Sequence, residues 1–224
     1  MEAYSDVAVE PAVRGFLHEP TAGTASGAAL VLTHGAGANC QSPLLTAVAE
    51  AFAASGVAVL RCDLPFRQAR PKGPPLRTAA LDQAGLRSAV ESVRKALGAK
   101  RMFLGGHSYG GRQATMLAAD EPDLVEGLLL LSYPLHPPRK PEQRRTQHFA
   151  RLRTPALFVH GERDPFGTIE EMRAALALVA GRTELVAIEG TGHDLGLAVQ
   201  ADALRATRRE LIREIVEAWR AFAR

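Results

Sequence analysis

The sequence predicts an α/β fold in which parallel strands alternate with crossover helices that cover both faces of one sheet. Short apolar runs alternate with helical patterns from about residue 28 onward, which is typical of repeated strand–helix–strand units. The runs are apolar throughout, as expected of strands that are covered on both faces. Residues 1–224 contain no repeat, linker or low-complexity tract, so we expect a single domain.

The N-terminal part of the chain predicts three strands and a helix. Two antiparallel strands are expected at 6–10 and 13–19, and a buried strand follows at 28–33. Ser42, with a proline directly after it, is typical of a helix N-cap, and Gly56 is typical of a helix end. The first crossover helix is therefore expected between these two residues.

The middle of the chain predicts a strand, a loop and a second helix. The strand covers 57–62, and the loop, which is rich in proline and arginine, covers 63–75. Spacings of four, three and four residues then separate four apolar side chains, Leu86, Val90, Val93 and Leu97. This spacing predicts one buried helix face, and Gly98 marks the end of the helix.

The rest of the chain continues the alternation of strands and helices. Strands are expected at 101–106, 125–132, 154–161 and 183–190. The helix after the first of these stops before Pro122. Thr168 and Glu171 form a capping box for a helix that ends at Gly181. A final helix over about 202–223 carries Leu204, Leu211, Ile215, Trp219 and Phe222 on one side.

Composition and charge restrict the classes of function. Apolar residues make up 46% of the chain and charged residues 23%, which is ordinary for a globular protein, and the formal net charge is +3. Arginine gathers at 61–77 and at 139–153. Neither segment contains a nucleic-acid-binding motif or an interleaved ladder of aromatic residues, so we expect solvated surface and no nucleic-acid partner. An anionic substrate is the alternative reading of these arginines.

The cysteines and the N-terminus indicate a protein of the cytoplasm. Cys40 and Cys62 have no metal-ligand spacing and are too few for a disulfide framework, so we expect two buried, reduced thiols and no metal. The N-terminus lacks the pattern of a signal peptide. No apolar run approaches the length of a membrane span, so no membrane partner is expected.

The sequence GHSYG at 106–110 is the first candidate for chemistry. Its serine lies between a predicted parallel strand and the next helix, where ligand sites of such sheets are found. A sharp turn there exposes the central side chain and strains its backbone. Gly106 and Gly110 fit this turn because side chains would clash with neighbouring backbone. Ser108 is therefore a candidate nucleophile, and a purely structural glycine-rich turn is the alternative.

A nucleophilic serine needs a base, and the base needs an acid that orients it. In this kind of turn the chain order is serine, then Asp or Glu, then histidine. Asp164 and His193 each follow the carboxyl end of a predicted strand, so they can meet Ser108 at one edge of the sheet. Glu162 and Asp194 are further carboxylates nearby, although Asp194 adjoins the histidine and would make an awkward partner.

Backbone N–H groups are expected to stabilise the oxyanion. One comes from Tyr109, directly after the serine, and the other from Ala36 in the glycine-rich loop at 34–39. The Tyr109 side chain either lines the pocket or packs beside it. His34 is expected to brace the glycine-rich loop, and His107 is expected to point away from the pocket.

Several other polar residues are expected to lie at the surface. His148 lies in the second arginine-rich segment and His136 just before it, and surface positions are favoured over metal ligation for both. The positive side chains in the loop at 63–75 could border the pocket, but a solvated loop is favoured. These side chains are Arg67, Arg70 and Lys72.

Together these motifs resemble the α/β-hydrolase family over nearly the whole chain. The segments LTHGAG, CDLPFRQARPKGPP, GGHSYGGR and HGERDPFG resemble a small bacterial subgroup near the dienelactone hydrolases. The resemblance implies an eight-stranded, mostly parallel sheet, with Ser108 as nucleophile, Asp164 as acid and His193 as base. Dienelactone hydrolases proper use a cysteine nucleophile, so their substrate does not transfer to this chain.

The segment at 133–153, between the sixth and seventh strands that the resemblance implies, is too short for a substantial lid domain. An open site favours hydrolysis of small or exposed substrates. We therefore expect a serine hydrolase that cleaves carboxylic esters or related acyl bonds of a small molecule through an acyl-enzyme. No metal or cofactor is needed for this chemistry.

Two other functions remain as alternatives. LTHGAGANC at 32–40 follows a predicted strand, as a dinucleotide-binding turn would, and Asp63 ends the next strand. However, Cys40 stands where that motif has its third glycine, and a Y-x-x-x-K pair is missing. A non-enzymatic interaction protein on a hydrolase scaffold is the other alternative, because some relatives of the subgroup are subunits of complexes.

Overall fold

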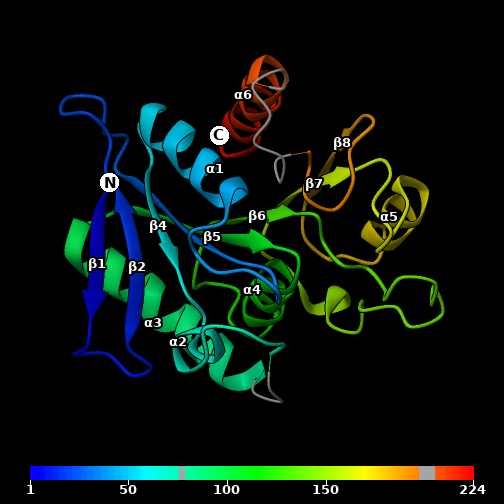
Figure 1. Cartoon of the computed structure of the whole chain (residues 1–224), viewed down its shortest axis with the longest axis horizontal. Helices are drawn as coiled ribbons and strands as arrows, with labels where there is room; N and C mark the ends of the chain where they lie inside the picture. Colours follow the sequence, from blue (N-terminus) through cyan, green and yellow to red (C-terminus); the bar gives the residue numbers. More distant parts are fainter. Residues whose placement is uncertain (76–78, 197–204) are drawn as a thin grey trace.

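The computed structural model describes residues 1–75, 79–196 and 205–224. Within these ranges eight strands form one sheet in the spatial order β1-β2-β4-β3-β5-β6-β7-β8 (Figure 1). β2 is antiparallel to both of its neighbours, and the remaining neighbours pair in parallel. The predicted eight-stranded, mostly parallel sheet is confirmed. The strands are β1 (Glu2–Asp6), β2 (Val13–His18), β3 (Ala28–Thr33), β4 (Ala58–Cys62), β5 (Arg101–His107), β6 (Gly127–Leu131), β7 (Ala156–Gly161) and β8 (Thr183–Ile188).

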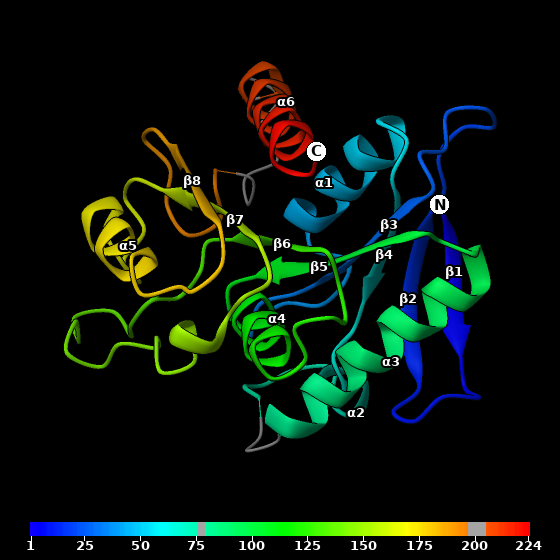
Figure 2. The ribbon, with the colours of Figure 1, turned by 180° about the vertical axis from the view of Figure 1, so that it is seen from behind.

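Helices cover both faces of the sheet, as predicted. α1 and α6 lie together on one face, and α3 and α4 lie on the other (Figures 1 and 2). None of the helices in the described ranges is long and apolar enough to cross a membrane. The helices are α1 (Pro43–Ala54), α2 (Pro65–Ala69), α3 (Ala79–Leu97), α4 (Tyr109–Asp120), α5 (Ile169–Leu176) and α6 (Arg205–Phe222).

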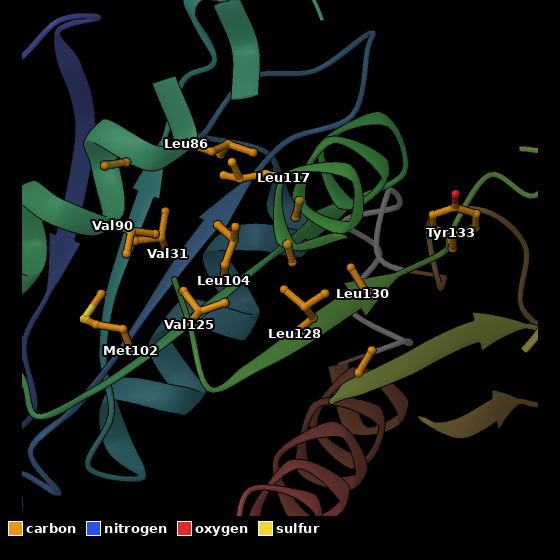
Figure 3. Close-up of a cluster of buried hydrophobic side chains, with 14 of the residues drawn as sticks. Val31, Leu86, Val90, Met102, Leu104, Leu117, Val125, Leu128, Leu130 and Tyr133 are labelled. Atoms are coloured by element: carbon orange, nitrogen blue, oxygen red, sulfur yellow. The ribbon is translucent and has the colours of Figure 1, made fainter. Parts of the chain in front are cut away.

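Two hydrophobic cores explain why the parallel strands are apolar throughout. Successive residues of a strand point to opposite faces of the sheet. Ala29 and Val31 of β3 therefore belong to the core beneath α3 and α4, whereas Leu30 and Leu32 belong to the core beneath α1 and α6. Figure 3 shows strand and helix side chains that meet in the first core: Val31, Leu104, Leu128, Leu86, Val90 and Leu117.

The first strand lies nearer the N-terminus than predicted. The sequence predicts a strand at 6–10, but β1 covers Glu2–Asp6. The Asp6 carboxylate accepts a hydrogen bond from the backbone N–H of Ala8 at 3.0 Å, which turns the chain at the point where the strand was expected to begin. Tyr4, in the middle of β1, shares a 2.6 Å hydrogen bond with Ser92 of α3. Local polar contacts thus decide this boundary.

Two helical boundaries also differ from the prediction. The expected loop at 63–75 contains the short helix α2, which begins at Pro65. α5 ends at Leu176 rather than at Gly181. The backbone N–H groups of Ala180 and Gly181 instead donate to the carbonyl groups of Phe149 and Leu152. The expected start of the last helix and its Leu204 lie outside the described residues, but the apolar side chains farther along α6 are buried, as expected: Leu211, Ile215, Trp219 and Phe222.

Candidate active site

Ser108 occupies a strained turn between β5 and α4. Its backbone φ is 51° and ψ is −116°, in a region that residues other than glycine rarely adopt. A Cβ atom on Gly106 would lie 2.8 Å from the carbonyl oxygen of Thr33, and one on Gly110 would lie 2.6 Å from that of His34. Real Cβ atoms do not approach backbone so closely, so the expected need for glycine at both positions is confirmed.

The His193 side chain lies between the Ser108 hydroxyl and the Asp164 carboxylate. Its Nε2 atom is 2.8 Å from Ser108 Oγ, and its Nδ1 atom is 2.8 Å from Asp164 Oδ2. Asp164 follows β7 and His193 follows β8, so the three side chains meet at the carboxyl edge of the sheet. The Asp164 side chain is fully buried, and its other oxygen accepts the backbone N–H of Phe166 at 2.9 Å.

The two neighbouring carboxylates make other contacts. Glu162 accepts a hydrogen bond from the backbone N–H of Gly190 at 3.0 Å. Asp194 accepts one from the backbone N–H of Gly196 at 3.0 Å. Both therefore stabilise the turns of this edge, and Asp164 is the carboxylate that faces His193 Nδ1.

His107 and Phe166 flank the His193 ring. The His107 ring centroid lies 5.0 Å from that of His193, and its Nε2 atom is 2.8 Å from the His193 carbonyl oxygen. The Phe166 ring lies 4.2 Å from the His193 ring at an angle of 32°. Burial lowers the pKa of His107 to about 4, so its neutral ring donates to that carbonyl at neutral pH. Sequence reasoning missed both contacts, because they join segments far apart in the chain.

Two buried side chains, a histidine and an arginine, hold the glycine-rich loop after β3. His34 is fully buried; its Nδ1 lies 2.9 Å from the Gly35 carbonyl oxygen, and its Nε2 accepts the N–H of Leu64. His34 thus braces the loop as predicted. Arg67 of α2 donates to the Ala36 carbonyl oxygen at 2.7 Å and to that of Gly73 at 3.1 Å. The expectation that Arg67 is solvated is wrong, because its side chain is buried and its guanidinium donates to these two backbone carbonyl groups.

Tyr109 both lines the pocket and packs beside it. Its ring lies edge-on to Phe66 at 5.7 Å, and its hydroxyl donates to the Asp82 carboxylate at 2.8 Å. Asp82, at the start of α3, is completely buried and also accepts the N–H of Phe66. Burial is the main cause that raises the pKa of Asp82. Sequence reasoning missed this carboxylate, because Asp82 belongs to no motif and its partner Tyr109 lies 27 residues away in the chain.

A pocket of about 630 Å³ opens beside Ser108 and Tyr109. Its apolar walls are formed by Ala36, Pro75, Ala79, Pro134 and Phe166. Its polar wall is formed by Arg112, Gln113 and Arg145, none of which was singled out in the sequence. Arg112 could have been found from its position, since it lies one helical turn after Ser108 on the same helix.

The segment at 133–153 folds against the body of the protein and buries both of its histidines. His148 Nε2 is 2.8 Å from the Thr115 hydroxyl of α4, and His136 Nε2 is 3.3 Å from the Glu171 carboxylate of α5. The expectation that His136 and His148 lie at the surface is therefore wrong. Arg70 and Lys72 are exposed as expected. Cys40 and Cys62 are free and buried, as expected.

In the segment considered for dinucleotide binding, the residue that would bind the ribose contacts other groups of the protein. The Asp63 carboxylate, which would have to meet a ribose, accepts the backbone N–H of Cys40 at 2.7 Å. It also lies 3.4 Å from the buried His34 ring. These contacts use Asp63 within the protein rather than for a ligand.

Comparison with known proteins identifies the family of the chain. Residues 26–224 match the family model described as an alpha/beta hydrolase domain. The chain belongs to the α/β-hydrolase family. Hydrolase is thus its enzyme class, and the resemblance seen in the motifs is confirmed.

Solved structures of α/β hydrolases share the fold of this chain. A serine hydrolase homologue from Coxiella burnetii is 18% identical with a TM-score of 0.74, covering 97% of this chain and 96% of that one. A dienelactone hydrolase from Anabaena variabilis is 23% identical with a TM-score of 0.73, covering 96% of each chain. A lidless serine hydrolase from Xanthomonas campestris is 17% identical with a TM-score of 0.68, covering 98% and 95%.

Proposed function

We propose that this α/β hydrolase is a serine hydrolase that cleaves carboxylic esters, or related acyl bonds, of small or exposed substrates. The observation that carries the proposal is the pair of 2.8 Å contacts that join His193 to Ser108 on one side and to Asp164 on the other. A buried carboxylate, an imidazole and a hydroxyl in this order form a device that makes the hydroxyl nucleophilic.

In the first half of the reaction, Ser108 Oγ attacks the carbonyl carbon of the ester while His193 Nε2 takes the hydroxyl proton. Asp164 accepts the Nδ1–H of the ring, which fixes its tautomer and stabilises its positive charge. The backbone N–H groups of Tyr109 and Ala36 stabilise the oxyanion. The tetrahedral intermediate then expels the alcohol, which takes the proton from His193, and the acyl group stays on Ser108.

In the second half, a water molecule attacks the acyl-enzyme. His193 takes one proton from the water, and the hydroxide adds to the acyl carbon. When the second tetrahedral intermediate collapses, the proton returns to Ser108 Oγ and the carboxylic acid leaves. The short segment at 133–153 supports hydrolysis over acyl transfer, because the described residues form no lid that would exclude water from the pocket.

Substitution of the nucleophile tests the proposal directly. Ser108→Ala is expected to lower kcat for p-nitrophenyl butyrate by at least about a thousandfold, because it removes the hydroxyl that His193 Nε2 contacts. A fluorophosphonate probe is expected to label the wild type and not this variant. Ser55→Ala, which removes a hydroxyl at the end of α1, is the matched control. Undiminished turnover by Ser108→Ala, or a wild type that resists the probe as a non-catalytic scaffold would, contradicts the proposal.

A further inference from the structure

Two arginines from different parts of the chain form one wall of the pocket. Arg112 belongs to α4, and its backbone N–H donates to the Ser108 carbonyl oxygen at 3.0 Å. Arg145 belongs to the segment at 133–153. The two positive charges are close enough to repel each other: burial lowers the pKa of Arg145, and the charge of Arg112 lowers it further. The fold thus holds two guanidinium groups beside the candidate nucleophile.

Neither guanidinium has a carboxylate partner among the described residues. Other arginines of the chain, such as Arg87 and Arg151, form ion pairs with Glu121 and Asp120. Arg112 Nε, in contrast, is buried without a hydrogen-bond partner. Within the part of the chain that the structure describes, the Arg145 guanidinium donates to one backbone carbonyl, that of Pro134, at 3.2 Å. Two like charges brought together without an acid leave a site that favours an anion.

Gln113 adds a third donor to the same wall. Its side chain is completely buried, and its Oε1 atom accepts a hydrogen bond from Gln83 at 3.1 Å. Its Nε2 atom is buried without a partner. A buried amide donor without a partner is destabilising, and an acceptor on a ligand in this pocket would satisfy it.

Arg145 is held in position by the segment that carries it. Its backbone N–H donates to the Leu135 carbonyl oxygen at 2.8 Å, and its own carbonyl accepts the hydroxyl of Tyr133 at 2.6 Å. Tyr133, which follows β6 (Figure 3), is completely buried in the core. Arg144, the preceding residue, is exposed. The contrast indicates that the fold orients one arginine of this segment toward the pocket and leaves its neighbour in solvent.

We propose that the substrate is an ester that carries an anionic oxygen group, bound by Arg112 and Arg145 with Gln113 while its acyl bond lies at Ser108. The planar fork of arginine pairs well with a carboxylate or a phosphate. The apolar walls of the pocket contact the carbon skeleton between the anionic group and the ester. This inference rests on the proposed function, since it names the substrate class of that same site.

Substrates that differ in charge test the inference. In one set the charge lies on the alcohol side of the ester. The anionic members are 3-acetoxybenzoate and 3-acetoxyphenyl phosphate, and the neutral partner is 3-acetoxybenzamide. A second set is monophenyl adipate, which carries the charge on the acyl side, and its neutral methyl ester. The readout is the ratio of kcat/KM for each anionic ester to that for its neutral partner. The carboxylate and phosphate members report which anion the site takes.

Arg112→Gln and Arg145→Gln are each expected to lower this ratio about ten- to a hundredfold, because each removes a charged hydrogen-bond donor. The corresponding lysine variants are expected to restore part of it. Arg144→Gln, in the same segment but exposed, is the matched control and is expected to keep the wild-type ratio. The ratio is independent of how much of each variant is folded, because both substrates meet the same enzyme preparation.

The inference is overturned if the arginine variants leave the ratio unchanged for both substrate sets, or if Arg144→Gln lowers it equally. That result differs from a failure of the proposed function. If the serine mechanism is wrong, the hydrolysis of both the neutral and the anionic esters continues in the Ser108→Ala variant. If only the anion site is wrong, neutral ester hydrolysis still depends on Ser108 while charge has no effect.

Discussion

At the residue scale, the orientation of the His193 ring depends on three neighbours. Asp164 bonds to its Nδ1, His107 donates to its carbonyl group, and Phe166 lies against one face of the ring. His107 stays neutral at neutral pH because burial lowers its pKa to about 4. It can therefore fix the backbone of His193 without adding a positive charge that would oppose protonation of the imidazole.

Asp164→Asn tests this arrangement. Asn keeps the size of the side chain but removes the charge that stabilises the imidazolium and favours the required tautomer, so we expect kcat for a neutral ester to fall by roughly 10³–10⁴. The rate of fluorophosphonate labelling at Ser108 should fall with it. Glu162→Gln changes a neighbouring carboxylate that bonds to Gly190 and should alter kcat by less than about tenfold. A larger loss in Glu162→Gln than in Asp164→Asn would reverse the assignment of the acid.

At the element scale, the loop after β3 is shaped by side chains that the hydrophobic pattern does not reveal. α2 brings the Arg67 guanidinium to the Ala36 carbonyl group, and this contact holds Ala36 in the pocket that Ser108 also lines. α3 brings Asp82 to the Tyr109 hydroxyl, which fixes the first residue of α4. Both backbone donors proposed for the oxyanion therefore depend on polar contacts between elements.

Arg67→Ala should separate catalysis from substrate binding at this loop. Loss of the bonds to Ala36 and Gly73 frees the loop, and we expect kcat to fall about ten- to a hundredfold with a smaller change in KM. Steady-state kinetics with p-nitrophenyl butyrate measure both constants. Arg70→Ala, an exposed position at the end of the same helix, is the control. Equal kinetics for the two variants would show that the loop keeps its shape without Arg67.

At the scale of the whole molecule, several histidines are buried in their neutral form. Burial is the main cause that lowers the pKa of His18, His107 and His148 from 6.5 to about 4 each. The His18 ring accepts a hydrogen bond from the buried Arg61 at 2.9 Å, which protonation would remove. The folded protein therefore binds fewer protons than the unfolded chain between these two pH values.

The free energy of unfolding should consequently fall as the pH drops from 6.5 toward 4. The stabilisation is fully present above pH 6.5, and each such histidine contributes at most about 3 kcal/mol. Urea titrations at several pH values measure this slope. His148→Gln keeps a side-chain contact to Thr115 but cannot be protonated, so its slope should be shallower than that of the wild type. Parallel slopes would show that His148 does not contribute.

The sheet and the candidate triad could be predicted because both leave regular signals in the sequence. Strands such as 28–33 are apolar throughout, and Ser108, Asp164 and His193 each follow a strand. The roles of these three residues remain a proposal, although the structure brings them together.

What could not be predicted depends on how the irregular segments fold. Arg67 and Arg145 lie in arginine-rich stretches that look alike in the sequence, and only internal carbonyl groups distinguish them from their solvated neighbours. Asp82 meets Tyr109 across 27 residues of chain. The start of β1 was misplaced because the Asp6 turn depends on one local hydrogen bond.

The segment at 133–153 is tied down at both ends. Near its start, Leu135 pairs with Arg145, and near its end the carbonyl groups of Phe149 and Leu152 accept bonds from the chain after α5. Residues 138–144, inside the loop that the Leu135–Arg145 hydrogen bond closes, are exposed. Exposed loops tolerate insertions, so protein engineers can exchange or lengthen this stretch while the sheet edge that holds the candidate triad keeps its structure.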